Sequence, residues 1–133
     1  MSTDTTASVS THILDTSIGR PAEGVAISLA ARAGFDADWV ALGGSATDAD
    51  GRCKDLPALP EGTTHVRLDF ETEAYFSKKS ANQQAEAQQD APANRDSGAF
   101  FPEVAITFAV KPGEHYHVPL LLNPFGYSVY RGS

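Results

Sequence analysis

The most constraining feature of this sequence is a series of short segments in which apolar and polar residues alternate with a period of two. The clearest segments are residues 8–14, where Val9, Thr11 and Ile13 share one face, and residues 64–70. Further candidates, separated by residues that favour turns, are residues 24–32, 39–42, 100–110, 115–122 and 127–131. Such alternation predicts β-strands, and its recurrence between turns predicts an all-β sandwich or barrel.

Other segments interrupt this pattern. Residues 71–79 lose the alternation and contain helix-forming residues, which predicts one short helix. Gly43, Gly44 and residues 47–51 are rich in residues that favour turns, so we expect the strand at 39–42 to end there. Residues 80–97 contain no large apolar side chain and predict a surface loop. We expect residues 1–7 to form a disordered N-terminal extension and residues 8–133 to form one domain.

Composition excludes several classes of function. The formal net charge of -7 argues against binding to nucleic acid or to an anionic membrane, because both require clustered Lys and Arg. The single cysteine, Cys53, cannot form an internal disulfide. No run of 18 apolar residues is present, and residues 1–10 lack the pattern of a signal peptide. We therefore expect a cytoplasmic protein that neither spans nor binds a membrane.

Histidines are the candidates for chemistry. His115 and His117 lie two residues apart on a predicted strand, so their imidazoles should project from the same face. This spacing occurs in metal sites, but a metal would need further ligands. The alternative is that one of the two acts as a general base, because imidazole titrates near neutral pH. His12 also lies within a strand, where a purely structural histidine is uncommon.

Two further features leave alternatives open. Arg52 follows a tight turn, where a guanidinium is usually a solvated surface group, although its donors also suit a ligand carbonyl or oxyanion. Residues 127–133 carry a strand pattern as far as Ser133. This segment is either packed into a site, which would fix the Ser133 hydroxyl and carboxylate, or an ordered terminal strand without a function.

Six motifs are present together: Ser10–Thr16 (STHILDT), Gly19–Ala22 (GRPA), Asp50–Arg52 (DGR), Phe101–Val104 (FPEV), His115–Leu122 (HYHVPLLL) and Tyr130–Ser133 (YRGS). In this combination the chain resembles the 5-hydroxyisourate hydrolases, the transthyretin-related enzymes, from about residue 8 to residue 133. The terminal tetrapeptide, the H-x-H motif and the early histidine make the resemblance specific. The chain departs from the family pattern at residues 80–97, which resemble an inserted surface loop.

The resemblance implies a transthyretin-like β-sandwich of two four-stranded sheets with one short helix. It implies a homotetramer with active sites at the dimer-dimer interface, and no metal or cofactor. The reaction implied is hydrolysis of the N1–C6 bond of 5-hydroxyisourate to 2-oxo-4-hydroxy-4-carboxy-5-ureidoimidazoline, in urate degradation toward allantoin.

The resemblance also implies the site residues. The catalytic residues would be His12, Arg52 and His117, with His115 as the alternative to His117. The substrate-binding residues would be Tyr130, Arg131, Gly132 and Ser133. Two other functions stay open: a carrier of small aromatic ligands that performs no chemistry, and a zinc-dependent hydrolase that uses His12, His115 and His117.

Overall fold

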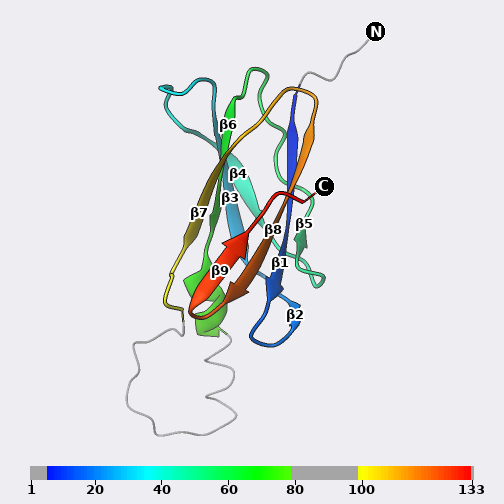
Figure 1. Cartoon of the computed structure of the whole chain (residues 1–133), viewed down its shortest axis with the longest axis vertical. Coiled ribbons are helices and arrows are strands. Elements are labelled where there is room, and N and C mark those ends of the chain that lie inside the picture. Colours follow the sequence, from blue (N-terminus) through cyan, green and yellow to red (C-terminus); the bar gives the residue numbers. More distant parts are fainter. Residues whose placement is uncertain (1–5, 79–98, 133) are drawn as a thin grey trace, which may run out of the picture.

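The computed structural model describes residues 6–78 and 99–132, which form two β-sheets packed face to face (Figure 1). The strands are β1 (Ser8–Asp15), β2 (Arg20–Pro21), β3 (Ala26–Arg32), β4 (Val40–Ala46), β5 (Arg52–Cys53), β6 (His65–Phe70), β7 (Val104–Ala109), β8 (His115–Asn123) and β9 (Gly126–Val129). One short helix is described over residues 72–78. The predicted all-β sandwich with one short helix is confirmed.

The first sheet has the strand order β2-β1-β8-β9. The short β5 pairs with Thr11 and His12 of β1, on the N-terminal side of the residues that pair with β2. β8 runs parallel to β1 over the full length of β1, from Ser8 opposite His115 to Asp15 opposite Leu122. The short β5 makes this a sheet of five strands, where four were predicted. Its two residues are too few to produce an alternation pattern, so this strand could not be found from the sequence.

The second sheet has the strand order β4-β3-β6-β7, with all pairs antiparallel. The prediction that β4 ends before Gly43 was wrong, because the strand continues through both glycines to Ala46. A side chain at position 44 would place its Cβ 2.5 Å from the carbonyl oxygen of Ile27. Gly44 therefore permits close approach to β3, beside a register shift at Leu29 and Ala30, and it does not mark a turn.

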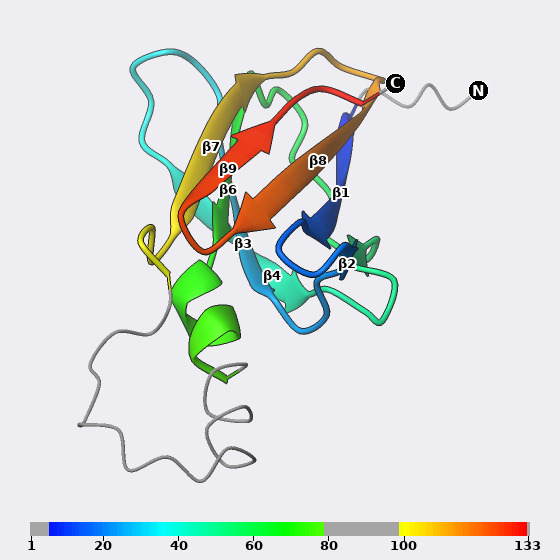
Figure 2. The same ribbon diagram turned by 60° about the horizontal axis from the view of Figure 1, so that its bottom comes forward.

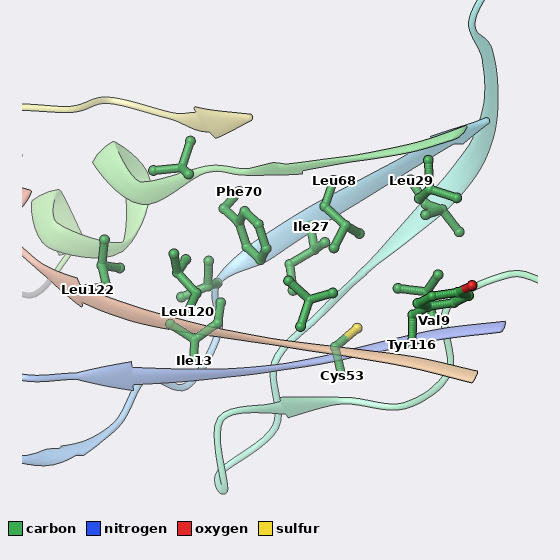
Figure 3. Packing of buried hydrophobic residues seen from close by; sticks show 14 of the residues in the cluster. Val9, Ile13, Ile27, Leu29, Cys53, Leu68, Phe70, Tyr116, Leu120 and Leu122 are labelled. Atoms are coloured by element: carbon green, nitrogen blue, oxygen red, sulfur yellow. The ribbon is translucent and has the colours of Figure 1, made fainter. Parts of the chain in front are cut away.

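The core lies between the sheets and consists of the apolar sides of the alternating strands (Figure 3). Ile13 and Leu120 of the first sheet and Leu68 and Phe70 of the second are fully buried. Cys53 is also buried in this layer. The predicted alternation of residues 8–14 and 64–70 is confirmed, since every second residue of β1 and β6 is buried.

The helix follows β6 and lies at one end of the sandwich (Figure 2). Phe76 is buried against the core, and the Tyr75 hydroxyl donates a 2.7 Å hydrogen bond to the carboxylate of Asp15 at the end of β1. This contact ties the helix to the first sheet. No helix in the described part of the chain is long and apolar enough to cross a membrane. The predicted loop insertion and most of the predicted N-terminal extension lie outside the described residues.

Candidate active site

The candidate site lies on the outer face of the first sheet, where β1 and β8 are neighbours. Alternation turns Thr11 and Val118 toward the core, where the Thr11 hydroxyl donates to the Val118 carbonyl oxygen at 2.6 Å. His12 and His117 therefore project from the opposite face, because successive strand residues point to opposite sides. Their ring centroids are 6.5 Å apart, and the ring planes are inclined by 31°.

Arg52 is brought to the same face by β5, which lies beside β1 (Figure 1). The pairing of the two strands places Arg52 directly opposite His12. Its position depends on the preceding turn, in which the Asp48 carboxylate accepts hydrogen bonds from the backbone N–H groups of Asp50 and Arg52. Residues that are directly opposite on paired strands have their side chains on one face. The structure thus brings together the three residues predicted to be catalytic.

Two serines, which the sequence analysis did not select, bond to the histidines of β8. Ser10 Oγ lies 2.9 Å from His117 Nδ1 and 2.9 Å from His115 Nε2, and Ser8 Oγ lies 2.7 Å from His115 Nδ1. The parallel register produces these contacts, because it places Ser8 opposite His115 and Ser10 opposite His117. The partners are more than one hundred residues apart in sequence, so no local pattern could have revealed them.

The environment of His117 favours a neutral ring. Partial burial lowers the pKa of His117 below its usual value of 6.5, because burial disfavours the charged form. Three neighbouring basic groups lower this pKa further, since a second positive charge is repelled: His12, His115 and Arg52. A neutral imidazole can accept a proton, so this ring is available as a base near neutral pH.

The terminal segment approaches the same face. The Gly132 N–H donates a 2.7 Å hydrogen bond to the His117 carbonyl oxygen. A side chain at position 132 would place its Cβ only 3.0 Å from His117 Cδ2, so a glycine here lets the terminal segment lie against the imidazole. Ser133 lies outside the described residues.

The other two residues predicted to bind substrate are placed differently. Tyr130 is exposed. The guanidinium of Arg131 lies 4.5 Å from the ring centre of Tyr116 and forms a 3.3 Å ion pair with Glu114. Tyr116 is buried on the side of β8 opposite to His117, so the structure does not bring the Arg131 side chain to the histidines of its own chain.

The fourth histidine and the metal-ligating side chains bear on alternative sites. His65 lies on the outer face of the second sheet, where its Nδ1 lies 2.8 Å from the hydroxyl oxygen of the adjacent Thr64. In residues 6–78 and 99–132, no three His, Cys, Asp or Glu side chains are grouped to hold a metal.

A mostly apolar pocket of about 250 Å³ opens where β7 and β9 lie side by side, on the core side of β8. Its lining includes Phe108, Tyr116 and Val129, and it contains none of the histidines. The histidines and Arg52 therefore lie outside this pocket, whereas Tyr130 and Arg131, two of the residues predicted to bind substrate, line it.

Comparison with known proteins connects this arrangement to a family. The chain is 39% identical over 127 residues to a protein of Salmonella dublin named 5-hydroxyisourate hydrolase, a match that covers 94% of this chain and 80% of the relative. The solved structure of Klebsiella pneumoniae 5-hydroxyisourate hydrolase is 35% identical, with a TM-score of 0.64 and coverage of 96% of this chain and 94% of that one.

A solved structure of sea bream transthyretin in complex with thyroxine is 26% identical, with a TM-score of 0.72 and coverage of 93% of each chain. The family model described as HIUase/Transthyretin matches residues 9–132, which include every candidate site residue except Ser133. The chain belongs to the HIUase/Transthyretin family.

Proposed function

We propose that this protein is a hydrolase that opens 5-hydroxyisourate at its N1–C6 bond. The product would be 2-oxo-4-hydroxy-4-carboxy-5-ureidoimidazoline, and the reaction would serve urate degradation toward allantoin. The observation that carries the proposal is the pairing of His12 and His117 on neighbouring strands, 6.5 Å apart between ring centres, with Arg52 opposite His12. Curated relatives with this activity in their names support the choice of substrate.

Hydrolysis of an amide-like bond requires an activated water, stabilisation of the charge on the attacked carbonyl and a proton for the leaving nitrogen. We assign the first role to His117, because burial and positive neighbours keep its ring neutral. His12, on the neighbouring strand, would protonate the leaving nitrogen. Arg52 would polarise the carbonyl, since its guanidinium carries several donors and a permanent positive charge.

The terminal segment would complete the substrate pocket, with Tyr130, Gly132 and Ser133 as binding residues. The hydrogen bond from Gly132 to His117 supports this role for the segment. The contacts of Arg131 with Tyr116 and Glu114 support a role in anchoring the segment, because they hold it against β8. No metal and no organic cofactor takes part in this proposed mechanism.

We also propose a homotetramer with its active sites at the dimer-dimer interface. In the single chain the site is an open face of one sheet, and a second copy would enclose it and exclude water. Exposed aromatic side chains on and beside β9, including Tyr127 and Tyr130, are available for contact with another copy. Light scattering coupled to size-exclusion chromatography should give a molar mass of four times 14.1 kDa.

A cytoplasmic location stays a prediction, and cell fractionation would test it.

The experiment that tests the function follows the ultraviolet absorbance of freshly generated 5-hydroxyisourate with wild-type protein and with His117→Asn. We expect wild-type protein to accelerate the decay and His117→Asn to reduce kcat by about 10²- to 10⁴-fold, the usual contribution of a positioned acid or base. Treatment with a chelator should leave the wild-type rate unchanged. Decay no faster than in buffer would instead favour a carrier, and loss of activity on chelation would favour a zinc hydrolase.

A further inference from the structure

Four side chains on the outer face of the first sheet form an unbroken hydrogen-bonded row. Starting from the candidate base, the row is His117, Ser10, His115 and Ser8, with successive N···O distances of 2.9, 2.9 and 2.7 Å. His117 and Ser10 are half-buried, whereas His115 and Ser8 are exposed. The row therefore leads from the proposed catalytic ring to residues that are exposed in the single chain.

The ring atoms used in this row determine what it can do. His115 is bonded at both nitrogens, through Nδ1 to Ser8 and through Nε2 to Ser10. The described hydrogen bond of the His117 ring is made at Nδ1. That bond leaves His117 Nε2 as the nitrogen that can face a substrate or a water molecule.

The Ser10 hydroxyl couples the two rings because it has a single proton. If Ser10 donates to His115 Nε2, its oxygen accepts from a protonated His117 Nδ1, and His117 Nε2 is then free to act as a base. If Ser10 instead donates to His117 Nδ1, the His117 proton lies on Nε2 and the ring can only donate there. The neutral tautomers of His117 and His115 are therefore linked, since the single Ser10 proton can be donated to only one ring and each ring nitrogen is either a donor or an acceptor.

We propose that Ser10 and His115 are positioning residues that form a proton relay, which sets the tautomer of His117 and carries a proton from the site to the surface. This inference rests on the proposed hydrolase function. Hydrolysis of an amide-like bond at neutral pH produces a carboxylate and an uncharged leaving nitrogen, so one proton per turnover must reach the solvent. The row of four side chains supplies a route for that proton.

The transfer conserves atoms and charge. Water loses a proton to His117 Nε2 as its oxygen forms the bond to the carbonyl carbon. The proton on His117 Nδ1 moves to Ser10 Oγ, the Ser10 proton moves to His115 Nε2, and the proton on His115 Nδ1 moves to Ser8 Oγ, whose own proton passes to solvent. His117 then carries its proton on Nε2. After the product leaves, His117 Nε2 gives its proton to water in the emptied site, while a proton taken up at Ser8 returns along the row to His117 Nδ1, and this restores the base form.

Four variants test the relay in the full-length protein. Ser10→Ala breaks the row, and Ser10→Thr keeps the hydroxyl. His115→Gln retains an amide that can bond to Ser10. Unlike the imidazole, this amide cannot accept a proton from Ser10 and release another toward Ser8. His65→Gln is the matched control, because it makes the same change on the outer face of the other sheet. Circular dichroism and thermal unfolding should show that all four variants fold.

We expect Ser10→Ala and His115→Gln to lower kcat by about 10-fold or more, below the roughly 10²- to 10⁴-fold effect of losing the base itself. KM should stay close to the wild-type value, because the relay acts through His117 and not by binding substrate. Ser10→Thr should restore most of kcat, and His65→Gln should match wild type. The double variant Ser10→Ala/His115→Gln should be no slower than the slower single variant, since both changes interrupt one row.

Imidazole nitrogen NMR gives a readout that does not depend on turnover. The tautomer populations of His117 should change in Ser10→Ala and in His115→Gln but not in His65→Gln. Wild-type kcat in a folded His115→Gln protein, or unchanged His117 tautomers in both variants, would overturn the relay. Failure of the wild-type protein to hydrolyse 5-hydroxyisourate would instead overturn the proposed function, and the two failures can be told apart because the tautomer measurement needs no substrate.

Discussion

The outer faces of the two sheets contain similar side chains in different arrangements. On the first sheet, His12 and His117 lie on neighbouring strands with Arg52 beside them and serines bonded to the β8 histidines. On the second sheet, His65 bonds only to the adjacent Thr64 in the described contacts, and Arg67 is paired with Asp69 at 3.2 Å. A histidine on a strand is thus not a site by itself. The register of the neighbouring strand decides whether it acquires chemical partners.

The variant with the largest expected effect tests this difference between the two outer faces most directly. His12→Asn should reduce kcat by about 10²- to 10⁴-fold, because it removes one acid or base from the proposed pair. His65→Asn, the same change on the other sheet, should leave kcat at the wild-type value. The measurement is the initial rate of 5-hydroxyisourate decay at saturating substrate. Equal activities of the two variants would mean that the pairing of histidines across β1 and β8 has no catalytic role.

The inner faces of the two sheets should contribute similarly to stability, and a pair of core variants can test this. Leu120 of β8 and Leu68 of β6 are both fully buried. Leu120→Ala and Leu68→Ala should each lower the free energy of unfolding by about 2–5 kcal/mol, because each removes buried apolar surface and leaves a cavity. Urea denaturation followed by tryptophan fluorescence would measure both. A loss confined to one variant would show that one sheet contributes little to the cooperative core.

The smallest expected effect concerns the pH dependence. Protonation of His117 removes the proposed base, so kcat/KM should fall as pH decreases through the His117 pKa, at a midpoint below the usual value of 6.5. The positive charge of Arg52 lowers this pKa, and Arg52→Gln should therefore move the midpoint to higher pH. Arg67→Gln removes a charge from the other sheet and should leave the midpoint unchanged. A midpoint that stays in place for Arg52→Gln would contradict electrostatic coupling between Arg52 and His117.

Much of the fold could be predicted from local patterns. The alternation in residues 8–14 and 64–70 correctly identified the buried faces of β1 and β6, because period-two burial is a property of a strand by itself. The strand end predicted at Gly43 was wrong, because the close approach of Gly44 to Ile27 is a contact with another strand. Likewise β5 exists through its pairing with β1 and has no pattern of its own.

The candidate site shows the same difference between what a local pattern reveals and what depends on contacts between strands. His12, Arg52 and His117 were selected from the sequence through the resemblance of their motifs, and the structure places them together. Ser8 and Ser10 were missed, since a serine in a strand gives no signal and their importance comes from the register with β8. Single residues of a site could therefore be found in the sequence, whereas the hydrogen bonds that connect them required the pairing of distant strands.

The parallel pairing of β1 with β8 has a consequence for biosynthesis. Among the described strands β1 is the first and β8 the last but one, so the site cannot assemble on the ribosome until residues 115–123 have been synthesised and released from the exit tunnel. Contacts between residues so far apart in sequence also form slowly, because a long loop must close first. Catalysis would therefore begin only after β8 has paired with β1, and enzyme activity would serve as a direct reporter of chains in which this pairing has formed.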